Sequence, residues 1–451
     1  MIAQYLNKKT KTAPLAVFRF FFGLLMFIST IRFWSYGWID SVYIQPKFYF
    51  TYYGFDFVKP LGEWTYLLFL ICAISSLAIC VGYKYRIAIV MFFLSFTYIE
   101  LIDKTPYLNH YYFVSLVSFL LMFLPANASF SIDAFLKPKK HFTHIPKWTI
   151  DSIKLILFIV YFYAGLAKLN SDWLMEALPL KIWLQNKYDA PLIGTYLKHN
   201  WVHYFFSWFG MLYDVFIVFF LLYKPTRVLA YITVVAFHLL THMLFPIGMF
   251  PYMMIVSGLI FFEASFHEKI IQSFNKLFRP SNVNDVTYRE YNFSKINTYF
   301  IAPIIGTFFI IQLLLPWRYL LYSGELFWTE EGYRFSWRVM LTEKVGYTVF
   351  TIVNPETGGS FEIRNGDFLT SFQIKQMSTQ PDFILQYAHM LRDHYISEGI
   401  ENPEVYVKSY VTLNGRLSQP FIDSKVNLAN EKESFASKQW VLPFNDEIKG
   451  L

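Results

Sequence analysis

Long apolar segments, repeated along the first two thirds of the chain, constrain the fold more than any other feature of the sequence. About nine occur, at residues 15–34, 65–82, 87–102, 111–125, 153–167, 205–223, 228–244, 248–262 and 298–316. A helix of about 20 apolar residues crosses a bilayer. Hydrophobic residues make up 55% of the chain and charged residues only 16%, a balance unusual for a soluble protein. The sequence therefore predicts a polytopic α-helical membrane bundle of about nine transmembrane helices.

The character of the sequence changes near residue 317. Charged residues, Gly and Asn become more frequent, and short β-patterned runs follow at residues 347–353, 360–363 and 405–413, with an amphipathic helical stretch at 382–398. We therefore predict two domains: a membrane domain over residues 1–316 and a β-rich α+β domain over residues 317–451.

Basic residues gather in short clusters between the apolar segments, within residues 8–11, 83–86, 137–147, 224–227 and 266–297. Loops rich in Lys and Arg stay on the cytoplasmic side of a membrane. With a cytoplasmic N-terminus, an odd number of spans puts the C-terminal domain outside, in the periplasm if the membrane is a bacterial inner membrane. These clusters account for the formal net charge of +7, so we expect the bilayer as a partner and no nucleic acid.

Lys168 ends the fifth apolar segment, within the stretch YFYAGLAKLNSDW at residues 161–173. A lysine at the end of a span either anchors the helix in the headgroups or works as a base. A base would need apolar surroundings, because burial disfavours the ammonium form. Spacing alone favours the anchor.

A second polar cluster lies in FHLLTHMLFPIGMFPYMM, residues 237–254. His238 and His242 share one helix face, a spacing that also occurs in zinc sites. No third ligand is evident, so we favour histidines that hydrogen-bond a polar ligand and predict no metal. The Pro-Ile-Gly and Phe-Pro steps predict a broken backbone, which a membrane protein tolerates where it lines a cavity.

Several other polar residues stand at the borders of the spans. Asn109 and His110 open the fourth span, either as a capped helix end or as functional groups. Arg19 and Arg32 could form ion pairs with Glu100 and Asp103, the usual reason that such charges persist in a bilayer.

The chain resembles the vitamin K-dependent gamma-glutamyl carboxylase family, whose membrane part also occurs in bacterial proteins of the HTTM type. Four stretches carry the resemblance in order: DKTPYLNHYYF (residues 103–113), YFYAGLAKLNSDW, FHLLTHMLFPIGMFPYMM and GYRFSWRVM (residues 332–340). The resemblance covers most of residues 10–345.

This resemblance implies an integral membrane enzyme that oxygenates reduced vitamin K, phylloquinol or menaquinol, to its epoxide with O2. In the family a basic alkoxide formed in that reaction removes a γ-proton from a peptide glutamate, and the carbanion captures CO2. The implied enzyme is a vitamin K hydroquinone epoxidase and peptidyl-glutamate 4-carboxylase, a carbon–carbon lyase that modifies proteins after translation. Its implied partner is a glutamate-containing peptide or protein, and the chemistry needs no metal.

The resemblance also assigns residues. It implies Lys168 as the catalytic base and His110 as a catalytic residue of the carboxylation half. His238, with Asn109 and His242, is implied in cofactor binding. The glutamate substrate is implied at Tyr333, Ser336, Trp337 and Arg338.

Arg338 departs from the family pattern, which has Ser-Trp-Asp where this chain has Ser336-Trp337-Arg338. Two alternatives therefore stay open beside the carboxylase. One is a hydroquinone epoxidase without glutamyl carboxylation. The other is a quinone-binding or transport protein without enzymatic activity, since broken spans also occur in transporters.

Overall fold

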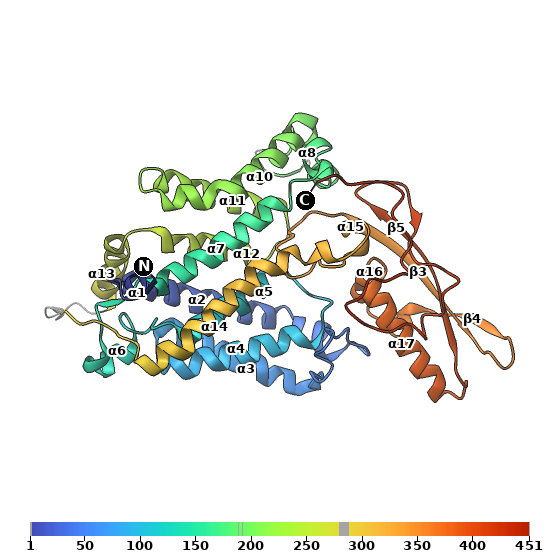
Figure 1. Cartoon of the computed structure of the whole chain (residues 1–451), viewed down its shortest axis with the longest axis horizontal. Helices are drawn as coiled ribbons and strands as arrows, with labels where there is room; N and C mark the ends of the chain where they lie inside the picture. Colours follow the sequence, from blue (N-terminus) through green and yellow to red (C-terminus); the bar gives the residue numbers. More distant parts are fainter. Residues whose placement is uncertain (1, 188, 192, 279–287, 451) are drawn as a thin grey trace.

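The computed structural model describes residues 2–187, 189–191, 193–278 and 288–450. Long helices form a bundle from the first two thirds of the chain, and a smaller domain with a β-sheet sits at one end of this bundle (Figure 1). We call that end of the bundle its domain side.

Seven helices among the described residues are long and apolar enough to cross a membrane. An eighth candidate span is a pair of helices that bend by 117° at their junction, and α5 is a shorter apolar helix. Together they are α2 (Ala13–Ser35), α3 (Thr65–Val81, preceded by η2, Gly62–Trp64), α4 (Tyr85–Ile102), α5 (Asn109–Phe123), α7 (Trp148–Leu166), α10 (Asn200–Leu222), α11 (Arg227–Leu244), α12 (Phe250–Gly258, with η5, Leu259–Phe261) bent against α13 (Ala264–Phe278), and α14 (Lys295–Leu314, extended by η6, Leu315–Leu321). Each apolar segment of the sequence is therefore helical, and the membrane bundle is confirmed.

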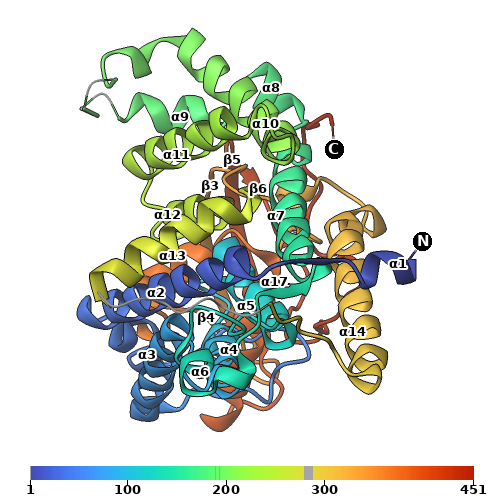
Figure 2. The ribbon, with the colours of Figure 1, turned by 90° about the vertical axis from the view of Figure 1, so that its left-hand side faces the viewer.

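Figure 2 views the bundle from its end. Helices α10 and α11 lie on one side and α3 and α4 on the other, with α2, α7 and α12 between them. Short elements connect these helices: α1 (Ile2–Leu6), η1 (Asp40–Ile44), α6 (Ile132–Leu136), η3 (Pro138–Lys140), α8 (Ser171–Met175), α9 (Leu180–Gln185), η4 (Tyr196–Lys198), and the paired strands β1 (Lys9–Lys11) and β2 (His144–Pro146).

Arg19 is fully buried in the bundle, but it is not held by an acidic side chain as we expected. Its guanidinium donates to the backbone carbonyls of Ala126 at 3.1 Å, Ile79 at 2.5 Å and Cys80 at 2.6 Å, and also to that of Phe130. Five N–H donors on one planar group can satisfy several carbonyls at once. Backbone carbonyls therefore replace the expected ion pair.

The C-terminal domain is built on a four-stranded antiparallel sheet in the order β4-β3-β5-β6. Strand β3 (Lys344–Val353) pairs along its length with β5 (Glu404–Leu413), and β4 (Ser360–Glu362) and β6 (Gln419–Pro420) flank them. Alternate residues are buried along both central strands, as in a sheet with one covered face. The domain also contains α15 (Leu326–Thr329), η7 (Asn365–Asp367), α16 (Ser371–Met377) and α17 (Pro381–Ser397).

Helix α17 covers the buried face of the sheet. The Tyr387 ring meets the Phe350 ring edge-on, with centroids 4.8 Å apart. The predicted strands and the predicted helix at 382–398 are confirmed. The boundary at residue 316 stays a prediction. Side chains before this boundary, such as Ala167 and Trp173, share one apolar core with side chains of the C-terminal domain.

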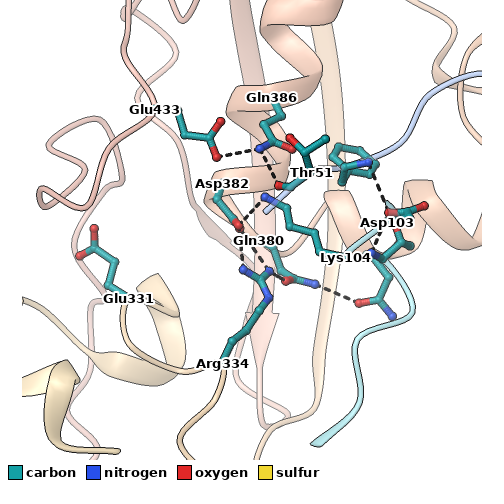
Figure 3. Close-up of polar contacts among 12 residues, drawn as sticks. Thr51, Asp103, Lys104, Glu331, Arg334, Gln380, Asp382, Gln386 and Glu433 are labelled. Carbon is teal, nitrogen blue, oxygen red and sulfur yellow. Dashed lines mark hydrogen bonds and ion pairs between the residues drawn. The ribbon is translucent and has the colours of Figure 1, made fainter. Parts of the chain in front are cut away.

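Charged contacts join the two parts of the chain. Asp382 at the start of α17 accepts from Lys104 at 2.8 Å and from Arg334 at 2.7 Å (Figure 3). Burial alone would raise the pKa of Asp382, but the two cations outweigh it and hold that pKa well below its usual range. Lys104 follows α4, so this cluster holds the domain to the bundle.

Candidate active site

Lys168 lies just past the end of α7, and its ammonium is buried. Its Nζ donates to a carboxylate oxygen of Asp214 at 2.7 Å and to the carbonyl of Ala164 at 3.0 Å. It also lies 5.4 Å from the centre of the Trp173 ring. The side chains of Lys168 and Asp214 are 8% and 9% exposed. A lysine that anchors a helix would extend into water or headgroups, so this lysine is not such an anchor.

Close approach of α7 and α10 makes this ion pair possible. A Cβ on Gly165 would lie 2.7 Å from the backbone nitrogen of Val215, the residue after Asp214. Any larger side chain at position 165 would therefore push the two helices apart. A glycine one turn from the lysine thus brings the carboxylate of α10 within hydrogen-bonding distance.

Lys168 and Asp214 line a cavity of about 340 Å³ between α7, α10, α11 and α12. Most of its other lining residues are apolar or aromatic, including Phe209, Phe237 and Phe250. His238 supplies a further polar group, and its Nε2 lies 2.9 Å from the hydroxyl of Tyr161. An apolar cavity with a few converging polar groups is typical of a small-molecule site. This is the cavity that the broken backbone after α11 predicted.

The residues after Lys168 fix the end of α7. Asn170 donates to the carbonyl of Ala167 at 2.9 Å and caps α8 by accepting from the backbone of Trp173 at 2.9 Å. Asp172 accepts two hydrogen bonds of 2.7 Å from Arg416 and one of 2.8 Å from Asn414, both in the C-terminal domain. The sequence KLNSDW is therefore a junction that positions Lys168 against the other domain.

Asn109 and His110 open α5, and the His110 ring lies near that of Phe250, as does the ring of His238. The centre of the Phe250 ring is 5.7 Å from that of His110 and 6.0 Å from that of His238. Asn109 donates to the carbonyl of Arg338 at 3.0 Å and accepts from the hydroxyl of Tyr107 at 3.1 Å. The start of α5 thus holds the segment at residues 332–340.

The segment at residues 332–340 has an unusual backbone. Phe335, Trp337 and Met340 have φ values of +64°, +60° and +54°, a region that costs residues with a Cβ about 1–3 kcal/mol each. Neighbouring side chains in this segment face different cavities. Val339 and Met340 line the Lys168 cavity, whereas Phe335 lines a larger one.

The predicted substrate residues of this segment are buried or partly buried in the protein. Ser336 is 2% exposed and Trp337 is 1% exposed, and the Trp337 ring packs 5.1 Å from that of Tyr112. Tyr333 is partly buried against Phe327. Arg338 stacks over Tyr319 at 4.5 Å, and its Nε and Nη1 atoms have no hydrogen-bond partner among the described residues.

Two protein families match this chain. Residues 7–266 match the HTTM domain, and residues 297–447 match the vitamin K-dependent gamma-carboxylase lumenal domain. The chain belongs to the vitamin K-dependent gamma-carboxylase family. No solved structure matches it significantly.

Membership in the carboxylase family makes the chain a vitamin K-dependent carboxylase-like membrane protein with a lumenal-type domain. The family implies reduced vitamin K as cofactor and glutamate-containing substrates. Of the residues implied in cofactor binding, His238 lines the Lys168 cavity, whereas Asn109 and His242 do not. The His242 side chain is exposed and contacts Tyr252, with ring centres 5.1 Å apart.

Sequence reasoning missed Asp214, Tyr161 and Arg416. Asp214 carried a signal, because it is the one charged residue in the apolar segment at 205–223, and a charge inside a span usually has a function. Arg416 carried no such signal. Its pairing with Asp172, 244 residues away, depends on how the two domains meet.

Proposed function

We propose that this carboxylase-family protein oxygenates a reduced naphthoquinone to its epoxide with O2 and couples the reaction to CO2 addition at the γ-carbon of a peptide glutamate. The observation that carries the proposal is the buried pair of Lys168 and Asp214 in an apolar cavity. Motif resemblance and both family matches agree with it.

The cavity suits a lipophilic quinol. Its volume of about 340 Å³ lies within the range of small-molecule sites, about 300–1,000 Å³. Aromatic walls fit a fused ring, and the buried polar atoms of Lys168 and His238 suit ring hydroxyls. The quinol, on reaction with O2, supplies the strong base that carboxylation needs.

Lys168 and Asp214 act as a pair in this proposal. The ammonium of Lys168 donates to an oxygen of the bound ring and stabilises the negative charge left when that oxygen loses its proton. The carboxylate of Asp214, 2.7 Å from Nζ, accepts a proton from the Lys168 ammonium, and the lysine nitrogen takes the proton of the ring hydroxyl in exchange. The sequence implied a lysine alone in apolar surroundings for this work, and the buried carboxylate adds a proton acceptor.

His238 orients the ring. Its Nε2 forms a hydrogen bond with the hydroxyl of Tyr161. This hydrogen bond fixes the plane of the imidazole. The apolar walls exclude water, so the base formed in the cavity is not quenched before it meets the acceptor.

The acceptor glutamate approaches from the side of the C-terminal domain in this proposal. The segment at residues 332–340 reaches the Lys168 cavity through Val339 and Met340. Asn109, which holds the carbonyl of Arg338, and the adjacent His110 stand on the same side. We assign His110 to the carboxylation half.

A second candidate function is epoxidation without glutamyl carboxylation. Two observations favour it: the positively charged Arg338 in the segment implied to bind glutamate, and the nearly complete burial of Ser336 and Trp337. Incorporation of labelled CO2 into a glutamyl peptide separates the two candidates.

We expect the membrane to be a bacterial inner membrane, with the N-terminus in the cytoplasm and the C-terminal domain in the periplasm. The basic clusters support this orientation. Accessibility of single introduced cysteines to a membrane-impermeant thiol reagent tests it.

The experiment that tests the function is epoxide formation, measured by mass spectrometry with reduced vitamin K and air. Wild type should form epoxide and Lys168→Ala should not. Lys276→Ala is a control that should match wild type, because Lys276 is exposed near the end of α13. Folded wild-type protein that binds quinone without forming epoxide would contradict the proposal and favour a binding or transport function.

A further inference from the structure

A second and larger cavity lies on the domain side of the bundle, with a volume of about 560 Å³. Its walls come from α4, α5 and α14 and from the C-terminal domain, and none of its lining residues lines the Lys168 cavity. The proposed reaction does not use it. We call it the seam cavity.

The floor of the seam cavity is apolar and belongs to the membrane helices. Phe93 of α4, Leu116 and Phe119 of α5, and Phe308 of α14 line it. The rings of Phe119 and Phe308 stack with centroids 5.4 Å apart. Each of these residues belongs to an apolar helix of the bundle, so the floor suits a hydrocarbon chain.

The mouth of the seam cavity carries an arginine without an anionic partner. Arg318 lines both this cavity and an adjoining hollow of about 380 Å³. It donates through Nη2 to the carbonyl of Arg334 at 3.2 Å, and its Nε is buried without a hydrogen-bond partner. Among the residues that the structure describes, no ion pair includes Arg318.

Other cations around the seam cavity are already paired. Lys104 and Arg334 share Asp382 (Figure 3), and Lys438 pairs with Glu331 at 3.4 Å. Arg318 is therefore the cation there that is left to meet the anionic group of a ligand.

The position of Arg318 along its helix suits a membrane surface. Arg318 stands in the last turn of a candidate span, which ends at Leu321. Leu320 and Leu321 beside it are 64% and 81% exposed. Exposed apolar side chains next to a basic residue at the end of a span are typical of a membrane interface.

We propose that the seam cavity binds an anionic phospholipid from the leaflet on the domain side, with its phosphate on Arg318 and an acyl chain on the apolar floor. An acceptor polypeptide fits less well. Its main-chain N–H and C=O groups would be unpaired on the apolar floor. Because the walls come from both domains, the bound lipid would stabilise their association.

Phosphatidylglycerol is the probe for the test. The protein is reconstituted in phosphatidylcholine nanodiscs with and without it, and lipid retention is measured by native mass spectrometry after extraction. Wild type should retain phosphatidylglycerol, and Arg318→Gln should retain it about tenfold more weakly, as expected for loss of a charge-assisted hydrogen bond. Leu116→Trp, which fills the floor, should also lose it.

Arg364→Gln is the matched control, because Arg364 is exposed on the C-terminal domain and the substitution removes the same charge. It should retain the lipid as wild type does. The thermal unfolding midpoint should rise with phosphatidylglycerol in wild type and in this control, but not in the other two variants. Dioleoylglycerol and inorganic phosphate should give no such rise.

Three results would overturn the proposal. One is equal retention by wild type, Arg318→Gln and Leu116→Trp. Another is the same rise in the midpoint with inorganic phosphate alone, which would show a simple anion site. The third is displacement of the lipid by a glutamyl peptide, which would make the cavity the acceptor site. Each readout is independent of epoxide formation.

Discussion

The ammonium nitrogen of Lys168 lies 2.7 Å from a carboxylate oxygen of Asp214, and both side chains are almost completely buried. A pair of this kind holds a proton between two groups that are shielded from water. Either partner alone would be an uncompensated charge in an apolar cavity, which is strongly unfavourable. The two residues therefore have to be tested both singly and together.

The first prediction concerns Asp214. The substitution Asp214→Asn removes the proton acceptor and should lower the rate of epoxide formation about 10²- to 10⁴-fold, the usual contribution of a general base. The initial rate is measured by mass spectrometry with saturating reduced vitamin K. A rate within about twofold of wild type would contradict the paired role.

A double variant separates catalysis from folding. Replacement of a buried ion pair by apolar residues of similar volume is often neutral or stabilising. Lys168→Met combined with Asp214→Leu should therefore keep the thermal unfolding midpoint of wild type and form no epoxide. A folded double variant that still forms epoxide would place the base elsewhere.

The second prediction concerns Tyr161, whose hydroxyl lies 2.9 Å from Nε2 of His238. Tyr161→Phe leaves the imidazole free to turn and should raise the KM for the quinol about five- to tenfold, consistent with one hydrogen bond, with a smaller effect on kcat. Tyr163→Phe is the control on the same helix, because its hydroxyl donates to the carbonyl of Leu313 in α14. A larger change in kcat than in KM for Tyr161→Phe would argue against an orienting role for His238.

Much of the architecture could be predicted from the sequence because it depends on local patterns. Apolar length determines which segments form membrane helices, and alternation of apolar residues determines strands such as β3. The stretch around Lys168 was recognisable because residue types such as Asn170 and Asp172 follow a long apolar segment at fixed spacing. Both have structural partners that explain their identity.

The contacts between distant segments could not be predicted. Arg19 was expected to pair with an acid, but the ends of neighbouring helices offer it carbonyl groups instead. The resemblance placed Ser336 and Trp337 among the substrate-binding residues, which stays a prediction, but it did not indicate that both side chains are buried in a segment with an unusual backbone. Local patterns do not specify which way such a segment faces, because that depends on packing between the two domains.

The third prediction concerns the contact of Asp172 with Arg416. The Asp172 side chain is 3% exposed, whereas Asp446, the other carboxylate on Arg416, is 54% exposed. Breaking a buried pair costs about 3–5 kcal/mol, and an exposed pair contributes about 0–1 kcal/mol. Asp172→Asn should therefore lower the thermal unfolding midpoint by several degrees, and Asp446→Asn should change it little.

Loss of this contact should also free the C-terminal domain from the bundle. Limited trypsin digestion should cleave Asp172→Asn faster than wild type, and epoxide formation should fall because the junction after Lys168 is no longer held. Equal effects of Asp172→Asn and Asp446→Asn would mean that burial of the pair is not what stabilises the junction.

The fourth prediction is a pH dependence that arises from Asp103, between α4 and α5. Burial raises its pKa from 3.8 to about 6, although hydrogen bonds from Thr105 and Phe50 oppose the increase. The folded protein therefore binds this proton more tightly than the unfolded chain does. Asp103 therefore adds to the free energy of unfolding at low pH, and this contribution is lost as the pH rises from about 4 to about 6.

The substitution Asp103→Asn removes this dependence. From pH 4.5 to pH 7, wild type should lose roughly 2 kcal/mol of stability relative to the variant, as linkage between the two pKa values requires. The apparent thermal midpoint at both pH values checks this, with Asp393→Asn as a control because that carboxylate is 64% exposed. If wild type instead gained stability relative to Asp103→Asn as the pH rose, Asp103 would be ionised in the folded protein. Its contacts with Thr105 would then outweigh the cost of its burial.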